Sequence, residues 1–391
     1  MILQALKDYY DRKAADPESG IAPLGWERKE IPYLIVLDRT GRLVTVEDTQ
    51  EKIGRKLRAR TFSVPQSVKR TVGIEPYFLW DNVEYVAGIV CKEGGSPARV
   101  ARQHDAFVAR LKPFAAIAEI GAVLRFLASD DAPSQLEAFD AWKEAKQSCA
   151  FVAFKFVGED GTIFDAPAVK EVVCGLSSAS KEGAVGVDLV SGARDVIALL
   201  HPALKGIPGA NTTGANIVSF NFPAATSFGK SQGGNSPVGV RSAFEYTTAL
   251  NTLLSKDSKQ KMMVGDATVV FWAEKDNPFE TALADFFAEP PKDNPDRLVG
   301  SVSALFRSPQ TGTGVYAEDE TTFYVLGLSP NAARIAIRFW HVGTVAEMAG
   351  RFRAYFDDLL IAHGPEDRDH LSLRRLLVLK MRSGCGKWDE A

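Results

Sequence analysis

The stretch IPYLIVLDRTGRLVTVED, residues 31–48, decides the fold class of this chain. An apolar run over residues 33–37 meets the turn sequence Asp38-Arg39-Thr40-Gly41, and a second apolar run covers residues 43–46. Two apolar runs joined by a short polar turn that contains glycine predict a β-hairpin. We therefore expect a sheet that begins near the N-terminus.

Apolar residues with helical spacing occur on both sides of this hairpin. At the N-terminus they place Ile2, Leu3, Leu6 and Tyr9 or Tyr10 on one face of an amphipathic helix. Further helices are predicted over residues 97–128, 132–148, 243–256, 296–306 and 345–362. Strands are predicted over residues 81–90, 149–157 and 267–274, and as a pair around Ser329-Pro330-Asn331 within residues 321–342.

These elements alternate without the regular rhythm of a doubly wound sheet, and we find no internal repeat. We therefore predict an α+β fold with mixed sheets, packed helices and long loops. One large irregular domain is expected over residues 1–362, with a candidate internal boundary near residues 130–148. The polar stretch HGPEDRDH begins at residue 363, so residues 363–391 are expected to form a linker and the start of a C-terminal helical region.

The composition is that of a globular protein with a sizeable core. The 391 residues are 46% hydrophobic and 24% charged, and 46 Lys and Arg against 49 Asp and Glu give a net charge of -3. No run of about 18 apolar residues and no signal peptide is evident, so we expect a cytoplasmic protein without membrane contact. Four cysteines and five histidines are scattered without a metal-binding spacing, so no metal and no cofactor are expected.

Motifs for catalysis are absent or incomplete. Gly229-Lys230-Ser231 is similar to the end of a phosphate-binding loop, but position 224 is alanine where the motif requires glycine. His104-Asp105 has no upstream histidine to complete a metal dyad, which favours a surface pair on a helix. No GxSxG nucleophile motif occurs. We therefore expect a protein that is not an enzyme.

Residues 52–70, here called the basic window, concentrate positive charge in a near-neutral chain. Gly54, Pro65 and nearby Gly73 interrupt the segment, so we expect an irregular backbone that can approach a ligand closely. The arginines suit forked contacts with phosphate, although a charge run is usually a solvated face balanced by acids elsewhere. The seven cations, with no acid among them, are Lys52, Arg55, Lys56, Arg58, Arg60, Lys69 and Arg70.

The stretch SFNFPAATSFGKSQGGNS, residues 219–236, is here called the long loop. It lies in a segment rich in Gly, Pro, Ser, Thr and Asn that cannot form a regular core alone. An ordinary flexible loop with two buried phenylalanines, at 222 and 228, is the simpler interpretation. The alternative is nucleic-acid contact, with aromatic stacking, a phosphate contact and base-edge hydrogen bonds. The candidate residues are Asn221, Phe222, Ser227, Lys230, Gln232 and Asn235.

Several sequence blocks together resemble one protein family. The opening MILQALKDYYDR with DPESGIAPLGW, the block VPQSVKRTVGIEPYFLWDN, the long loop, and the blocks AFEYTTALNTLLS and TVVFWAE occur in order along the chain. They resemble the large subunit of the type I-C CRISPR surveillance complex, Cascade, from residue 1 to about residue 360. Members of that family continue into a C-terminal helical region, and we expect that this chain ends before most of that region.

The resemblance implies a non-catalytic subunit of an RNA-guided antiviral complex. Such a subunit recognises the protospacer-adjacent motif in double-stranded target DNA, helps to open the duplex and binds the displaced strand. The implied partners are the crRNA, the backbone, handle-binding and small subunits of Cascade, and a helicase-nuclease that docks after target binding. Base pairing with the guide supplies most of the sequence specificity, by analogy with single-protein effectors.

Both candidate segments fit this implied role. The basic window suits the sugar-phosphate backbone of DNA, and the long loop suits motif reading and strand separation. The alternative is a structural assembly subunit that binds the 5′ handle of the crRNA and neighbouring subunits without reading DNA. In that case the basic window contacts RNA or protein.

Overall fold

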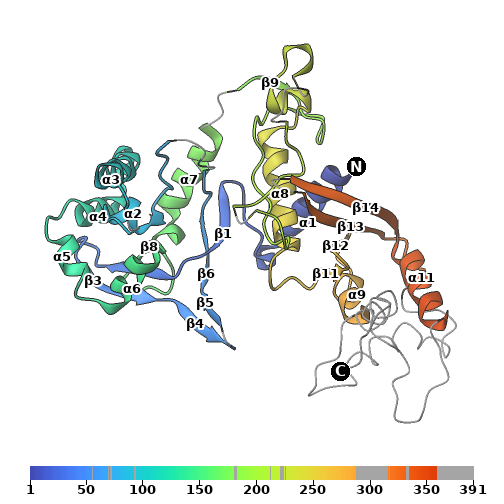
Figure 1. Ribbon diagram of the computed structural model, residues 1–391, viewed down its shortest axis with the longest axis horizontal. Coiled ribbons are helices and arrows are strands. Elements are labelled where there is room, and N and C mark those ends of the chain that lie inside the picture. The colour runs from blue at the N-terminus through green and yellow to red at the C-terminus, as the bar shows by residue number, and fades with distance from the viewer. Residues whose placement is uncertain are drawn as a thin grey trace, which may run out of the picture. The chain divides into compact units, whose positions relative to one another are not determined.

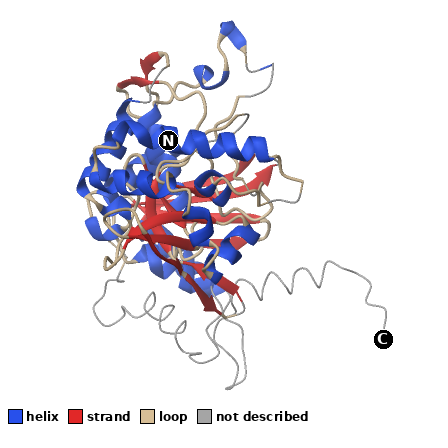
Figure 2. Cartoon of the chain, turned by 90° about the vertical axis from the view of Figure 1, so that its left-hand side faces the viewer, coloured by secondary structure: helices blue, strands red, loops and turns tan. Residues whose placement is uncertain are grey.

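The computed structural model describes residues 1–54, 56–68, 70, 73–91, 94–179, 183–211, 213–220, 224, 226–287, 316, 318–331 and 334–358. The chain divides into two compact units. The inserted unit comprises Gly20–Glu182, and the terminal unit comprises Met1–Ser19 with Gly183–Ala391. Both units contain helices and strands. The chain as a whole mixes the two (Figure 2), which confirms the predicted α+β class. The predicted domain limits near residues 130–148 and 362 stay predictions.

The inserted unit is built on the hairpin that opens the sequence. Strands β2 (Tyr33–Leu37) and β3 (Leu43–Asp48) pair antiparallel, and all five residues of β2 are buried. The turn contains Gly41 at φ +93, a conformation that glycine adopts without a steric penalty. Asp38 Oδ1 accepts hydrogen bonds from the Thr40 and Arg42 amides at 2.8 and 3.0 Å, which fixes the turn.

This hairpin extends into a four-stranded sheet of order β3-β2-β8-β7. Strand β8 (Phe151–Phe156) runs parallel to β2, and the short β7 (Trp80–Asn82) runs antiparallel to β8. Two smaller ribbons complete the strands of the unit, β1 (Trp26–Glu30) with β6 (Thr61–Pro65), and β4 (Gln50–Ile53) with β5 (Lys56–Ala59). The large side chains of Trp80, Trp142 and Phe154 are fully buried in the core.

Helices pack on this sheet (Figure 1). The segment predicted as helical over residues 97–128 is divided after Leu111, and the helix Pro167–Ala179 was not predicted. The segment predicted as one helix over residues 132–148 is two helices, because Glu137–Phe139 leave helical conformation. Residues 81–90 were predicted as a strand, and this is wrong beyond Asn82. The helices of the unit are α2 (Val83–Ala87), α3 (Pro97–Leu111), η2 (Lys112–Phe114), α4 (Ala118–Leu127), α5 (Ala132–Leu136), α6 (Asp140–Ser148), η3 (Ile163–Asp165) and α7 (Pro167–Ala179).

The terminal unit packs the N-terminal helix against segments from the second half of the chain. Helix α1 (Ile2–Ala14) packs against α8 (Val240–Leu253), where the Tyr10 and Phe244 rings meet edge to face at 5.8 Å. Arg12 in α1 donates to Glu280 at 2.5 Å, and Tyr9 donates to Gln260 at 3.0 Å. The predicted amphipathic helix is confirmed, although its buried residues are Ala5, Leu6, Tyr9 and Tyr10, whereas Ile2 and Leu3 are half-buried.

An antiparallel sheet of order β11-β12-β13-β14 forms the second layer of this unit. Its strands are β11 (Lys261–Val264), β12 (Ala267–Ala273), β13 (Thr322–Asn331) and β14 (Arg334–Thr344). The predicted strand pair is confirmed, but Ser329–Asn331 belong to β13, so the turn lies later than predicted. Every residue of β12 is buried, as its continuous apolar run predicts.

The remaining elements of the terminal unit are short or flank these layers. Helix α11 (Val345–Asp358) matches most of the predicted segment 345–362, and the predicted helix over residues 296–306 lies outside the described residues. No helix in the described ranges is both long and apolar enough to cross a membrane. The other elements are η1 (Pro17–Ser19), β9 (Val185–Val187), β10 (Arg194–Val196), η5 (Ser227–Gly229), η6 (Gln232–Asn235) and α9 (Phe279–Phe287).

Candidate nucleic-acid interface

The basic window is largely β-strand, so the prediction of an irregular backbone is wrong for most of it. Strands β4 and β5 form a hairpin whose turn contains Gly54 at φ +63, and β6 follows directly. In the described part of the window, the glycine turn, Arg60 and the end of β6 at Pro65 interrupt the strands. Strand pairing places Arg58 directly opposite Glu51, so side chains of opposite charge are neighbours on one face.

Acids from other strands lie beside the arginines of the window. An oxygen of Glu30 in β1 is 4.0 Å from Arg58, and an oxygen of Glu47 in β3 is 3.9 Å from Arg60. The second oxygen of Glu47 is only 2.9 Å from Lys155, which makes Lys155 the closer partner. Long, exposed ion pairs of this kind contribute about 0.2–1 kcal/mol, so phosphate can displace them. Lys52 is exposed on β4.

Arg70 differs from the other cations because its guanidinium is held inside the unit. It is 23% exposed and forms an ion pair with Asp81, which is fully buried. Its Nε donates to the carbonyl of Glu75 at 2.7 Å, and its guanidinium lies 3.9 and 4.0 Å from the ring centroids of Tyr77 and Tyr85. Arg70 therefore stabilises the inserted unit, and its contact with DNA stays a prediction.

The remaining predicted cations of the window are only partly visible. Arg55 and Lys69 lie outside the described residues, and so does the side chain of Lys56. The described part of the candidate interface is Lys52, Arg58 and Arg60. Lys52 pairs with Leu57 and Arg58 with Glu51, so Lys52 and Arg58 point to opposite faces of the β4–β5 ribbon, and Arg60 lies between β5 and β6.

In the long loop, the described residues 226–236 form a compact loop tip. Two short 3₁₀ turns, η5 and η6, build it, and Phe228 and Gln232 adopt positive φ values of 57° and 46°. The Phe228 side chain is 99% exposed, so the simpler interpretation, in which it is tucked into the core, is wrong. Asn221, Phe222 and the side chain of Ser227 lie outside the described residues.

The polar candidates of the loop tip have distinct roles. Lys230 and Gln232 are exposed, whereas Asn235 is half-buried and donates to the carbonyls of Gln232 at 3.1 Å and Lys230 at 3.5 Å. Asn235 therefore shapes the turn, and Lys230 and Gln232 face solvent. Phe228 is one of the two phenylalanines that the alternative interpretation of the sequence assigns to aromatic stacking on bases. Positive φ at a phenylalanine, which is rare, could not be read from the residue types.

Asp188, which the sequence does not single out, anchors the end of the loop to α8. Its carboxylate accepts hydrogen bonds from Gly239 N at 2.9 Å and from Ser242 Oγ and Ser191 Oγ at 2.5 Å. Burial opposes ionisation, but the hydrogen bonds from Ser191 and Ser242 outweigh it and lower the pKa of Asp188 to about 2. The chain entering α8 is thus fixed just after the loop tip.

Comparison with protein families gives the class of protein: the chain is a CRISPR-associated protein. The matching family is described as CRISPR-associated protein (Cas_Csd1), and the match covers residues 6–384, so the chain belongs to this family. No curated protein matches the chain. The family confirms the resemblance found in the sequence at the level of a CRISPR-associated protein, and it is consistent with a Cascade subunit.

Proposed function

We propose that the protein is the large, non-catalytic subunit of a type I-C Cascade complex. In this role it recognises the protospacer-adjacent motif, helps to open the duplex and binds the displaced strand. The observation that supports this most directly is the loop tip, where an exposed Phe228 stands beside exposed Lys230 and Gln232. Such a tip combines a ring that stacks on bases, a cation for phosphate and an amide for base edges.

The strands of the basic window provide the second element of the proposal. Lys52, Arg58 and Arg60 contact the sugar-phosphate backbone, where they give affinity without sequence preference. The crRNA, the other Cascade subunits and a helicase-nuclease are the proposed partners. The alternative function is a structural subunit whose basic window binds the 5′ handle of the crRNA. It is supported by the same cations, because phosphate chemistry is common to both nucleic acids.

The first test removes two exposed cations, Lys52 and Arg60, by alanine substitution in the assembled complex. We expect target affinity to fall for matched and mismatched motifs alike, and the slope of log affinity against log salt to become shallower by about 2. The reason is that two fewer phosphates are neutralised. Target binding over a salt series measures both quantities.

A matched control removes two exposed lysines elsewhere in the same unit, Lys143 and Lys170, whose side chains are 50% and 55% exposed. This variant loses the same charge and should keep the original slope. An unchanged slope in the Lys52 and Arg60 variant would contradict the proposed contact. Loss of crRNA loading or assembly, with normal target binding by the complexes that do form, would favour the structural alternative.

The second test concerns the exposed ring of the loop tip. Phe228→Ala should weaken binding of paired target DNA on the order of tenfold, because aromatic stacking on a base contributes about 1–3 kcal/mol. Phe228→Trp should retain binding. A target whose strands are already unpaired next to the motif should lose less affinity in the alanine variant, because the ring no longer has to offset the cost of separating the bases.

The control for this variant is Met263→Ala, which removes another exposed apolar side chain from the same unit. It should leave target binding unchanged. The thermal stability of both variants should remain close to that of the wild type, since neither side chain is buried. An equal loss on paired and unpaired targets would mean that Phe228 does not separate strands.

A further inference from the structure

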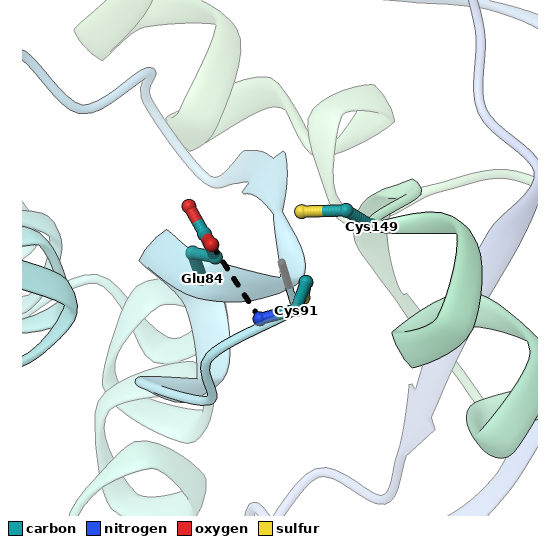
Figure 3. A group of neighbouring side chains, drawn as sticks. All are labelled: Glu84, Cys91 and Cys149. Atoms are coloured by element: carbon teal, nitrogen blue, oxygen red, sulfur yellow. Dashed lines mark hydrogen bonds between the residues drawn. The ribbon is translucent and has the colours of Figure 1, made fainter. Parts of the chain in front are cut away.

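Glu84, Cys91 and Cys149 converge in the inserted unit although the sequence separates them widely. One oxygen or sulfur atom from each lies within 4.8 Å of the other two, and all three residues are half-buried. In the described residues, this is the one group of three or more His, Cys, Asp or Glu side chains with such a spacing. Figure 3 shows Glu84 and Cys91 on one stretch of chain and Cys149 on another.

Strand pairing explains why these distant residues meet. Strand β7 pairs antiparallel with β8, with Asn82 opposite Phe151, and Val83 N continues this pairing to the Ala150 carbonyl at 3.2 Å. Val83 begins α2, and Ala150 directly follows Cys149 at the end of α6. This hydrogen bond therefore brings the start of α2, which contains Glu84, beside the end of α6 and Cys149.

Local caps complete the group. Asn82 accepts a hydrogen bond from Tyr85 N at 3.2 Å and starts α2, and Gly88 at φ +68 ends it. The chain then turns back, so that Cys91 N donates to Glu84 Oε1 at 3.4 Å (Figure 3). Cys149 ends α6 with φ 48 and ψ 45. This left-handed conformation is unfavourable for most residues and is adopted readily only by glycine and, less often, by asparagine or aspartate.

The chemistry of these three groups matches one class of ligand. Thiolates and a carboxylate are donors that Zn²⁺ accepts in tetrahedral sites. With Zn–S of about 2.3 Å, two thiolates on one zinc ion lie roughly 3.8 Å apart, so the observed group needs only a small contraction.

We propose that Glu84, Cys91 and Cys149 form a zinc site, with water in the fourth position. The ion joins the loop after α2 to the end of α6, just before β8, and so fastens the edge of the central sheet. This site acts on the fold of the inserted unit, and it does not depend on the proposed role in DNA recognition.

The test uses the full chain, kept reduced without added thiols, stripped of metal by a chelator and titrated with Co²⁺. We expect one equivalent of Co²⁺ to give a thiolate-to-cobalt charge-transfer absorption that Zn²⁺ then displaces. Zn²⁺ should also raise the thermal unfolding temperature, since it binds only the folded arrangement. Absence of the charge-transfer band in the wild-type protein would overturn the proposal.

Three variants assign the ligands. Cys149→Gly should abolish the band and the Zn²⁺ shift, without lowering the stability of the metal-free protein, because glycine adopts the left-handed conformation readily. Glu84→Gln should weaken Co²⁺ binding by on the order of tenfold or more. The matched control Cys174→Ser removes an exposed cysteine of the same unit and should behave like the wild type. A band that survives in Cys149→Gly would overturn the proposal, because it would arise from other thiols.

Discussion

Arg70→Ala is expected to lower the free energy of unfolding of the inserted unit by about 3–5 kcal/mol, because it leaves a buried carboxylate without its cation. Asp81 is fully buried, and Arg70 is the cation that pairs with it. The substitution also removes the guanidinium from between the Tyr77 and Tyr85 rings. Chemical denaturation of the full chain at neutral pH, monitored by tryptophan fluorescence, measures the effect.

The effect should depend on pH in a defined direction. Burial raises the pKa of Asp81 above its ordinary value, and the ion pair with Arg70 opposes this. A carboxyl group with a raised pKa in the folded protein favours folding below its ordinary pKa and loses that contribution as the pH rises through the raised value. Without Arg70 the pKa rises further, so the destabilisation should be greatest at neutral pH and shrink as the pH falls and Asp81 takes up a proton.

Arg60→Ala is the matched control, since Arg60 belongs to the same basic window but its side chain is 51% exposed. It should change stability by less than about 0.5 kcal/mol. A loss for Arg70→Ala that is equally small, or that does not change with pH, would contradict the structural role. If the prediction holds, weaker target binding by an Arg70 variant cannot be read as a lost DNA contact.

The fold was predictable where apolar periodicity is strong and local. The pattern of residues 31–48 predicts β2 and β3, and the continuous run ATVVFWA predicts the buried β12. The strand prediction failed over residues 83–87, because the apolar residues Val83, Tyr85 and Ala87 alternate as they would in a strand. The cap outweighs that alternation: Asn82 starts a helix by accepting from Tyr85 N, and Gly88 ends it. Short helices carry too few apolar residues for period alone to identify them.

The candidate site was less predictable because its partners are remote along the chain. The basic window contains no acid between Lys52 and Arg70, yet strand pairing brings Glu30 and Glu47 beside its arginines. Likewise, no spacing rule links Cys91 to Cys149. The two cysteines come close to each other because β7 pairs with β8. Charge type and loop composition identify candidate segments, but neighbours in space depend on the register of strands far apart in sequence.

Gly233→Ala is the second substitution with a large expected effect. It acts where the loop tip packs against the backbone of Ala198 and Leu199. A Cβ atom at Gly233 would lie 2.0 Å from the carbonyl oxygen of Ala198 and 3.1 Å from the Cα of Leu199. Both contacts are with backbone, so neither can be relieved by a side-chain rotation. The loop must lift, breaking the hydrogen bond from Gly233 N to the Leu199 carbonyl at 3.3 Å. We expect a cost of at least about 3 kcal/mol, the upper end for overpacking.

The neighbouring glycine provides the control, because a Cβ at Gly234 meets only the Cβ of Lys230, at 3.8 Å. Gly234→Ala should therefore leave the loop packed against Ala198 and Leu199. Faster amide hydrogen exchange over residues 226–236 in Gly233→Ala alone would report the lifted loop. If the loop tip reads the adjacent motif as proposed, the same variant in the assembled complex should bind matched and mismatched motifs with nearly equal affinity. A lifted loop that still discriminates would mean that another segment reads the motif, because Phe228, Lys230 and Gln232 would no longer be held in place.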